Sequence, residues 1–475
     1  NKYYNIFKIV RNNPLIMNTQ IINPLTSIKN IYFIGIGGIG MSALARYFNT
    51  QGVKVSGYDK TPTVLTDDLV KEGIQIHFED DLNQIDKVAT VVVYTPAIPG
   101  DHKELNYYRD HGYNVVKRSD VLQWVTENAF TIGIAGTHGK TTTTSMTAHI
   151  LRHTEYGCNA FLGGIASNYN TNFWSHEKNV VVVEADEYDR SFLKLSPNIA
   201  VITAVDPDHL DIYGTAEEVL KAFGQYADKI KPGGTLIQKM GTTVVTSWDH
   251  KTIQTYGYEK NGASYHTQNL KVVDGSYIFD LVHPGGVLKE VVLNMGGLHN
   301  VENVTAAIAI ALTLGIDENK IKLAVADFKG VKRRFEYKVK TANKVLIDDY
   351  AHHPEELNAL ISGVRSIYPG EKMVLVFQPH LYSRTQDQCD GFVETLDKAD
   401  EVILLPIYPA RELPIPGVTS DMLIEKMSIS KKQVMSKEAL LAWAATTPDK
   451  LIVMAGAGDI DVCINQVKDL LISTK

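Results

Sequence analysis

A glycine loop between an apolar strand and a helix-compatible segment places the strongest constraint on how this chain folds. Residues 132–135 are apolar, Gly136–Lys140 reads GTHGK, and Thr141 begins a segment that suits a helix. Glycines let several backbone N–H groups point at one anion, while the lysine reaches terminal phosphates and the hydroxyl suits magnesium. The pattern predicts a nucleotide-phosphate site in an α/β fold. A glycine turn without a nucleotide is the alternative.

The loop is a short form of the usual phosphate-binding pattern. Ile134 stands where the first glycine of that pattern is expected, which leaves GxxGKT. The helix that follows adds the positive end of its dipole to the same site. The residues expected to hold the nucleotide phosphates are Gly136, Thr137, His138, Gly139, Lys140, Thr141 and Thr142.

A second strand–glycine–helix unit lies earlier in the chain. Residues 30–34 read as a buried strand, and Gly35, Gly37 and Gly40 match G-x-G-x-x-G ahead of a helical segment. The next strand ends in Asp59, at a spacing typical of dinucleotide-binding units. These features predict a nucleotide-binding βαβ unit. They do not say which nucleotide it binds, so NAD remains an alternative here.

Polar side chains follow two predicted strands of the middle region. Residues 180–183 form a β-branched apolar run typical of a strand buried on both faces, and Glu184 follows directly. Because this edge faces the phosphate-loop crevice, Glu184 is the primary candidate for a magnesium ligand. Residues 199–205 form another strand, which precedes His209; a ligand, a base and a capping residue all remain open for this histidine. Weaker metal candidates are Asp186, Glu187 and Asp189.

The following region holds two further candidates. Residues 235–293 read as short strands, a β-rich insertion without a chemical signature. Asn300 precedes a long alanine-rich helix and suits either an adenine contact or a helix cap. The cluster Lys332–Arg334 suits either a phosphate clamp or a basic surface patch.

The last third repeats the pattern of an apolar strand followed by polar residues. One strand covers residues 345–347, with Asp348 and Asp349 expected beyond its end. Three later strands have similar polar ends, so a second open α/β domain with its own crevice is predicted. The pair His352-His353 is weak evidence for a metal, because adjacent histidines point in different directions.

Composition excludes several classes of function. The net charge of −7 gives no basic field for nucleic acid or for an anionic membrane, and no apolar run reaches the length of a membrane span. Three separated cysteines fit a reducing compartment and hence a cytoplasmic location. Residues 1–16 precede Met17 and are expected to be an upstream extension.

Taken in order, these motifs resemble the Mur ligase family of peptidoglycan synthesis. Each stretch is modest alone, but their joint order is specific and covers nearly the whole chain. The matching stretches are FIGIGGIGMSALA, AGTHGKTTT, EADEYDRSFL, DPDHLDIYG, GLHNVENVTAA, GVKRRFE, DDYAHHPEE, FQPHLYSRT, LPIYPARE and AGAGD.

The resemblance implies an α/β protein with three domains. It also assigns the first glycine loop to the UDP of a substrate and not to NAD. The expected parts are an N-terminal extension (1–25), a Rossmann-like UDP-sugar domain (26–125), a central P-loop ATPase with a parallel sheet and the β-rich insertion (126–335), and a C-terminal Rossmann-like domain (336–475).

The resemblance is strongest to family members that add L-alanine to UDP-N-acetylmuramate. It implies that the lactyl carboxylate attacks the γ-phosphate of ATP, with Mg²⁺ as cofactor, to give an acyl phosphate. The alanine amine then attacks the acyl carbon, and ADP and phosphate are released. The partners are therefore three small molecules, without nucleic acid or membrane.

The resemblance also implies residue roles. The catalytic set is Lys140, Glu184, His209, Arg334 and His352, and the metal ligands are Thr141, Glu184 and His209. ATP would be held by the phosphate loop with Asn300, Arg334 and Asp349. The UDP-sugar would be held by Gly35, Gly37, Gly38, Gly40, Asp59, Thr95 and Ala97. The amino acid would be held by His353, His380, Arg384 and Arg411.

Two departures and three rivals accompany this reading. Leu381 stands where relatives often have an arginine, so Arg384 or Arg411 is expected to hold the amino-acid carboxylate instead. No lysine is assigned to the carbamylated position that several members use. The rivals are a recycling ligase that joins a preformed peptide to the same UDP-sugar, an NAD-dependent dehydrogenase, and a nucleotide-sensing protein without chemistry.

Overall fold

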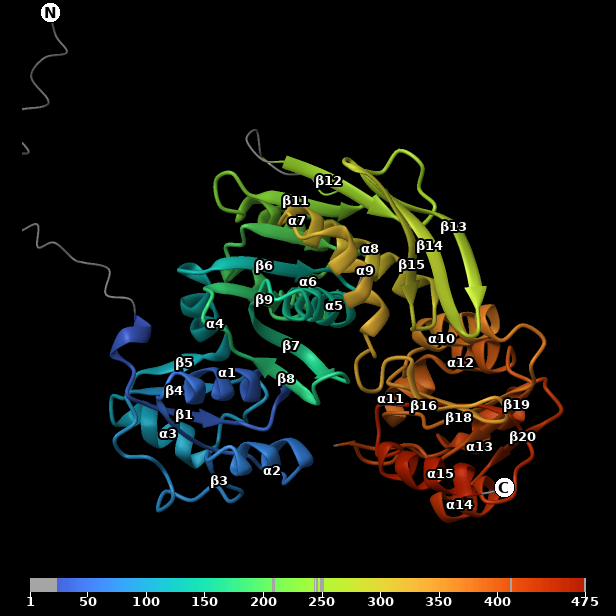
Figure 1. Ribbon diagram of the computed structural model, residues 1–475. Helices are drawn as coiled ribbons and strands as arrows, with labels where there is room; N and C mark the ends of the chain where they lie inside the picture. The colour runs from blue at the N-terminus through green and yellow to red at the C-terminus, as the bar shows by residue number, and fades with distance from the viewer. Residues whose placement is uncertain are drawn as a thin grey trace, which may run out of the picture. The chain divides into compact units, whose positions relative to one another are not determined.

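The chain forms two compact units in a computed structural model (Figure 1). Among the described residues, the first comprises residues 24–37 and 48–128, and the second comprises residues 38–47 and those from 129 onward. The structure describes residues 24–206, 210–242, 244, 247, 252–410 and 412–473. His209, Arg411 and the predicted extension at residues 1–16 lie outside this description.

The first unit is built on a parallel sheet in the order β3-β2-β1-β4-β5. The strands are β1 (Asn30–Ile34), β2 (Lys54–Tyr58), β3 (Gln75–His77), β4 (Val91–Tyr94) and β5 (Val115–Lys117). Around them come η1 (Pro24–Ser27), α2 (Val64–Lys71), α3 (Lys103–Asp110) and α4 (Arg118–Glu127). Helix α1 (Ile39–Thr50) is divided, since its residues up to Tyr47 belong to the second unit. The strand order reverses between β1 and β4, the position at which open α/β sheets bind ligands. The first glycine loop follows β1 at this point.

The second unit contains a ten-stranded sheet in the order β15-β14-β13-β12-β11-β10-β6-β9-β7-β8. Its strands are β6 (Phe130–Ala135), β7 (Asn159–Ala166), β8 (Thr171–Trp174), β9 (Val180–Glu184), β10 (Ile199–Ile202), β11 (Thr235–Lys239), β12 (Thr252–Gly257), β13 (Tyr265–Val273), β14 (Ser276–His283) and β15 (Gly286–Leu293). The phosphate-loop strand β6 pairs in parallel with both β9 and β10. The β-rich segment therefore continues the same sheet, ending in the antiparallel strands β13–β15.

Helices cover this sheet and fix the phosphate-loop helix. They are α5 (Lys140–His153), η2 (Ser191–Lys194), α6 (Leu210–Tyr213), α7 (Ala216–Asp228), α8 (Leu298–Thr313) and α9 (Glu318–Asp327). Helix α5 packs against α8 and α9 and against β6 and β9 (Figure 1). Ala306 and Ala307 of α8 are fully buried, and such small side chains allow two helices to approach closely.

A six-stranded sheet completes the second unit, in the order β16-β17-β21-β18-β19-β20. Its strands are β16 (Glu336–Lys340), β17 (Val345–Asp349), β18 (Met373–Phe377), β19 (Glu401–Leu404), β20 (Lys432–Val434) and β21 (Leu451–Ala455), all parallel except β16. Its helices are α10 (Pro354–Ile367), α11 (Tyr382–Asp387), α12 (Cys389–Leu396), α13 (Ser420–Lys426), α14 (Lys437–Ala444) and α15 (Asp461–Ser473).

The first strand of this sheet is longer than predicted. β17 ends at Asp349, so Asp348 belongs to the strand, and its side chain is 1% exposed. The expectation that Asp348 and Asp349 lie beyond the strand is wrong, because an apolar pattern does not reveal that two carboxylates continue the strand. Within the part of the chain that the structure describes, no helix has both the length and the apolar character of a membrane span.

Candidate active site

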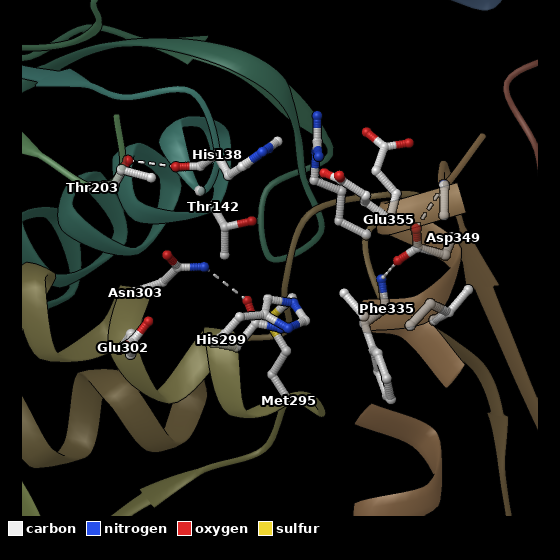
Figure 2. Close-up of a pocket in the computed structure, with 18 of the residues that line it drawn as sticks. His138, Thr142, Thr203, Met295, His299, Glu302, Asn303, Phe335, Asp349 and Glu355 are labelled. Carbon is white, nitrogen blue, oxygen red and sulfur yellow. Dashed lines mark hydrogen bonds between the residues drawn. The ribbon is translucent and has the colours of Figure 1, made fainter. Parts of the chain in front are cut away.

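The phosphate loop between β6 and α5 depends on two glycines. Gly136 has φ 142°, and a Cβ placed there would lie 2.0 Å from Oγ1 of Thr203. Gly139 has φ 80°, and its Cβ would lie 2.6 Å from Oδ1 of Asn303. The Thr203 hydroxyl also donates to the His138 carbonyl (Figure 2). Both the backbone conformation and the close neighbours therefore require glycine in this loop.

Lys140 is folded back over this loop. Its Nζ donates to the Gly136 carbonyl at 2.7 Å and to Oε1 of Glu187 at 2.8 Å. The Glu187 side chain is 1% exposed, and burial raises its pKa while the Lys140 charge opposes that rise. The sequence ranked Glu187 only as a weak metal candidate. No pattern in the sequence signalled that it is the ion-pair partner of the phosphate-loop lysine.

Glu184 ends β9 beside the first turn of α5. The Thr141 hydroxyl donates to its Oε1 at 3.1 Å, and no described residue hydrogen-bonds its buried Oε2. Burial raises the pKa of Glu184, while Lys140 and Arg334 lower it. A Cβ on Gly163 would lie 2.0 Å from Oε2, so this glycine leaves the space that the carboxylate occupies.

Thr141 and Glu184 fit a divalent cation. A buried carboxylate oxygen without a hydrogen-bond partner is costly unless a cation compensates it, and magnesium prefers oxygen ligands. The described residues hold no cluster of three or more His, Cys, Asp or Glu side chains that would make a complete site. The third predicted ligand, His209, lies outside these residues and stays a prediction.

A cavity of about 450 Å³ opens beside the phosphate loop (Figure 2). Residues of α8 line one side, and residues of β17 and α10 line the other. Of the predicted site residues, those that line it are His138, Gly139, Thr142, Asn300, Arg334 and Asp349. The cavity thus brings together predicted ATP contacts that lie more than 200 residues apart in the chain.

Two asparagine amides at the start of α8 form one side of this cavity. Asn303 Nδ2 donates to Oδ1 of Asn300 at 3.1 Å, and the Thr143 hydroxyl donates to Oδ1 of Asn303 at 3.2 Å. The prediction that Asn300 precedes the helix is wrong. Because α8 begins at Leu298, Asn300 lies within its first turn. Burial lowers the pKa of the neighbouring His299, which therefore presents a neutral ring to the cavity.

The basic cluster at residues 332–334 separates into three environments. Lys332 contacts the Asn170 side chain, and Arg333 donates to the Gly456 carbonyl. Arg334 lines the cavity. Lys332 is thus a surface residue and Arg334 faces the cavity, while the phosphate-clamp role of Arg334 stays a prediction.

Asp349 closes the cavity from the end of β17. Its oxygens accept hydrogen bonds from the backbone N–H groups of Phe335 and Ala351, both at 2.7 Å. Burial raises the pKa of Asp349 to about 6, although both hydrogen bonds and the Arg334 charge lower it. Part of the hydrogen-bonding capacity of Asp349 therefore shapes the protein itself.

The predicted amino-acid residues form a second cluster beyond β17 and β18. The His352 ring centre lies 4.6 Å from that of His353 and 6.0 Å from that of His380. Arg384 Nη1 lies 3.3 Å from Nδ1 of His380. Burial lowers the pKa of His352 to about 4, against the effect of Glu356, so its ring is neutral at neutral pH.

Asp59 holds the glycine loop that follows β1. Gly37 N donates to Oδ2 of Asp59 at 2.7 Å, and Thr61 N donates to Oδ1 at 3.1 Å. Gly35 has φ 86°, which glycine adopts without strain. Ala97 N donates to the Thr95 hydroxyl at 3.1 Å. Of the remaining two predicted residues, Gly38 accepts from Ser42 N and Gly40 lies in the first turn of α1.

Profiles of one protein family match three consecutive parts of the chain. The Mur ligase family catalytic domain matches residues 30–129, and the Mur ligase middle domain matches residues 134–311. The Mur ligase glutamate ligase domain matches residues 333–458.

Individual proteins are similar over almost the full length. The UDP-N-acetylmuramate–L-alanine ligase of Flavobacterium johnsoniae is 46% identical over 454 residues, 94% of this chain and 99% of that protein. The ligase of the same name from Cytophaga hutchinsonii is 48% identical over 453 residues, 94% and 97% of the two chains. The solved UDP-N-acetylmuramate–alanine ligase of Thermotoga maritima has a TM-score of 0.80 at 28% identity, covering 94% of this chain and 100% of that one. By its sequence and its fold, this chain belongs to the Mur ligase family.

Proposed function

We propose that this protein joins L-alanine to the lactyl carboxylate of UDP-N-acetylmuramate, consuming ATP and releasing ADP and phosphate in peptidoglycan precursor synthesis. The single observation that carries this proposal is the cavity in which Arg334 and Asp349 face the phosphate loop across a space suited to a nucleotide. The names of the relatives at 46% and 48% identity support alanine as the amino acid.

The first step requires two anions to approach each other. A lactyl carboxylate oxygen attacks the γ-phosphorus of ATP, the bond to the β-γ bridging oxygen breaks, and ADP leaves. Lys140 and Arg334 would stabilise the charge that spreads over the transferred phosphoryl oxygens. Lys140 must exchange at least one present partner for phosphate oxygens, and the loop N–H groups of Gly139 and its neighbours would hold the remaining charge.

Thr141 and Glu184 would hold a magnesium ion, with His209 proposed as a further ligand. When bound, the ion neutralises phosphate charge and orients the transferred group. The unpaired Oε2 of Glu184 supports this role, because it is buried and aimed at no hydrogen-bond donor among the described residues.

The second step forms the amide bond. The lone pair of the neutral alanine amine attacks the acyl carbon, and the tetrahedral intermediate collapses with loss of phosphate, which carries away the proton that the nitrogen gives up. Arg384 is proposed to pair with the alanine carboxylate, assisted by Arg411. His352, His353 and His380 would line this side, and the low pKa of His352 makes it a neutral hydrogen-bonding group there.

The first glycine loop is proposed to hold the UDP part of the substrate. Gly38 and Gly40 would offer backbone N–H groups to the diphosphate. Gly35 and Gly37, whose N–H groups donate to the Tyr58 carbonyl and to Asp59, would shape the loop around it. Asp59, Thr95 and Ala97 stand at the ends of the two neighbouring strands, β2 and β4, and would contact the rest of the nucleotide.

The test is phosphate release from ATP in the presence of UDP-N-acetylmuramate and a panel of amino acids. We expect release with L-alanine and little with glutamate or lysine. A parallel reaction offers the tripeptide that begins L-Ala-γ-D-Glu. Preference for the tripeptide would show that the protein is the recycling ligase, and hydride transfer to NAD without phosphate release would show a dehydrogenase.

A further inference from the structure

Two adjacent arginines at the entrance to the six-stranded sheet have different partners. Arg334 lines the cavity, whereas Arg333 turns toward the sheet. Nη2 of Arg333 donates to the Gly456 carbonyl after β21, and its Nε lies 3.6 Å from Oδ1 of Asp348 on β17. The Arg333 guanidinium also lies over the Tyr350 ring, with its central carbon 5.3 Å from the ring centre.

Asp348 is an unusual residue to find inside a strand. Its side chain is 1% exposed, and within the described part of the chain neither of its oxygens has a hydrogen-bond partner. An ionised carboxylate in this position is costly unless a nearby cation compensates it. Arg333 contributes the largest favourable charge effect, followed by Lys338, while Glu336 and Asp349 oppose it.

The backbone around Arg334 is bent on both sides. Arg333 has φ 59° and Phe335 has φ 49°, conformations that residues other than glycine rarely adopt. Both bends are tied to β17 and the residue after it, since Phe335 N donates to Oδ2 of Asp349 at 2.7 Å and Tyr350 N donates to the Arg333 carbonyl at 2.7 Å. The direction of Arg334 thus depends on contacts made by its neighbours.

We propose that Asp348 is a positioning residue which, through Arg333, holds Arg334 against the phosphate side of the cavity. The inference rests on the proposed ligase function. Asp348 lies outside the cavity and touches no substrate, but it would increase the rate of acyl-phosphate formation by keeping Arg334 in place. A one-ångström displacement of a clamp can cost about a hundredfold in rate.

The thermal stability of an Asp348 variant distinguishes a positioning role of Asp348 from a role in stabilising the fold. Burial raises the pKa of Asp348 to about 7, far above the usual value of an aspartate. Because the folded state favours the protonated acid, its ionisation costs stability as the pH rises through 7. A residue kept only for stability would not be an acid here. We therefore expect Asp348→Asn to have an unchanged or higher Tm at pH 8 and a lower kcat.

The first measurement is phosphate release by the full chain with ATP, UDP-N-acetylmuramate and L-alanine at pH 8. Asp348→Asn should lower kcat about tenfold and leave the KM of L-alanine within about twofold. The control is Asp461→Asn, because Asp461 is an exposed acid whose Oδ2 lies 4.0 Å from Nη1 of the same arginine. The control should match the wild type in kcat and in Tm.

The second measurement asks whether Asp348 acts through Arg334. In the Arg334→Lys background, adding Asp348→Asn should cause no further loss of kcat, because the clamp is already displaced. An independent tenfold loss in that background, or a single variant with normal kcat, would overturn the proposal. So would a kcat loss accompanied by a lower Tm at pH 8.

Arg333→Lys provides a second route to the same test. It keeps the charge and loses the planar fork that reaches both Asp348 and Gly456, so it should repeat the kcat loss of Asp348→Asn. If Asp348→Asn does not fold, this variant alone decides the question. A wild-type protein that does not ligate L-alanine would instead refute the proposed function, which the first reaction of the series reveals.

Discussion

The chain uses a glycine loop between a strand and a helix twice, and the two loops differ in what surrounds them. In the first unit, the Gly37 N–H donates at 2.7 Å to Asp59, an acid from the neighbouring strand end. In the second unit, Lys140 stands at the start of the helix, with Glu187 at 2.8 Å and Glu184 beside Thr141. Both loops have the same strand–loop–helix backbone arrangement, but the side chains around them differ.

The difference separates holding an anion from reacting with one. The sequence of the first loop, GIGGIG, contains no cationic side chain. Its backbone N–H groups can therefore bind an anion, but the loop supplies no charged group for phosphoryl transfer. The second loop adds an ammonium, a hydroxyl and a buried carboxylate, the groups that stabilise phosphoryl transfer. We expect damage to the first loop to weaken binding and damage to the second to slow the chemistry.

The largest effect should follow from Lys140→Ala. Loss of the only ammonium of the loop should lower kcat about 10²–10³-fold, because charge on the transferred phosphoryl group goes unmatched. Phosphate release at saturating substrates measures this effect. Lys71→Ala is the control, since that lysine side chain is 74% exposed and should be dispensable. Normal turnover of the Lys140 variant would remove the contrast between the loops.

Glu184→Gln should weaken the binding of Mg²⁺. The amide keeps the size of the side chain and loses its charge, so the Mg²⁺ concentration for half-maximal activity should rise at least about tenfold. The control Glu177→Gln changes an exposed acid just before β9 and should leave the Mg²⁺ titration unaltered. An unchanged titration for the Glu184 variant would exclude it as a ligand.

Asp59→Ala should affect recognition and leave the chemical step intact. Without the acceptor for the Gly37 N–H, the first loop loses its fixed shape, and we expect KM for UDP-N-acetylmuramate to rise about tenfold at constant kcat. Steady-state kinetics measures the effect, with Asp101→Ala, at an exposed acid of this unit, as the control. A fall in kcat without a change in KM would reverse the roles given to the two loops.

The smallest effect should appear in the wild type as the pH falls from 8 to 6. Burial raises the pKa of Glu184, so protons compete with the metal at a higher pH than for an ordinary glutamate. The half-maximal Mg²⁺ concentration should therefore increase severalfold, while KM for the UDP-sugar at saturating Mg²⁺ changes less. A Mg²⁺ requirement independent of pH in this range would show that protons do not compete with the metal at Glu184 between pH 8 and 6.

The sequence predicted the parts of the site that follow local rules. The α/β fold and the family are confirmed, and the glycines, Lys140, Thr141 and Glu184 lie together, because an apolar strand and a glycine loop fix the direction of the residues that follow. The histidines beyond β17 and β18 also meet, since parallel strands end at one edge. The functions of these residues, the domain boundaries, and His209 and Arg411 stay predictions.

Long-range packing determined what the sequence did not reveal. The pairing of Lys140 with Glu187 depends on the path of the turn after β9, which brings Glu187 back to the phosphate loop. No rule of sequence spacing predicts that path. The opposite directions of Arg333 and Arg334 follow from two backbone bends that are held by β17. The burial of Asp348 similarly depends on the sheet around it, since its sequence neighbours suggest an exposed strand end.

Gly163 has a consequence for how the protein tolerates variation. Its Cβ would collide with the end of the flexible Glu184 side chain, at 2.0 Å, and not with backbone, so the carboxylate can swing aside while the sheet remains intact. In a library of variants scored separately for protein abundance and for cell growth, the Gly163→Ala protein should reach normal abundance. The cells that depend on it should nevertheless fail to grow. A glycine that serves only to leave room for another residue's oxygen would thus be recognised by that discrepancy.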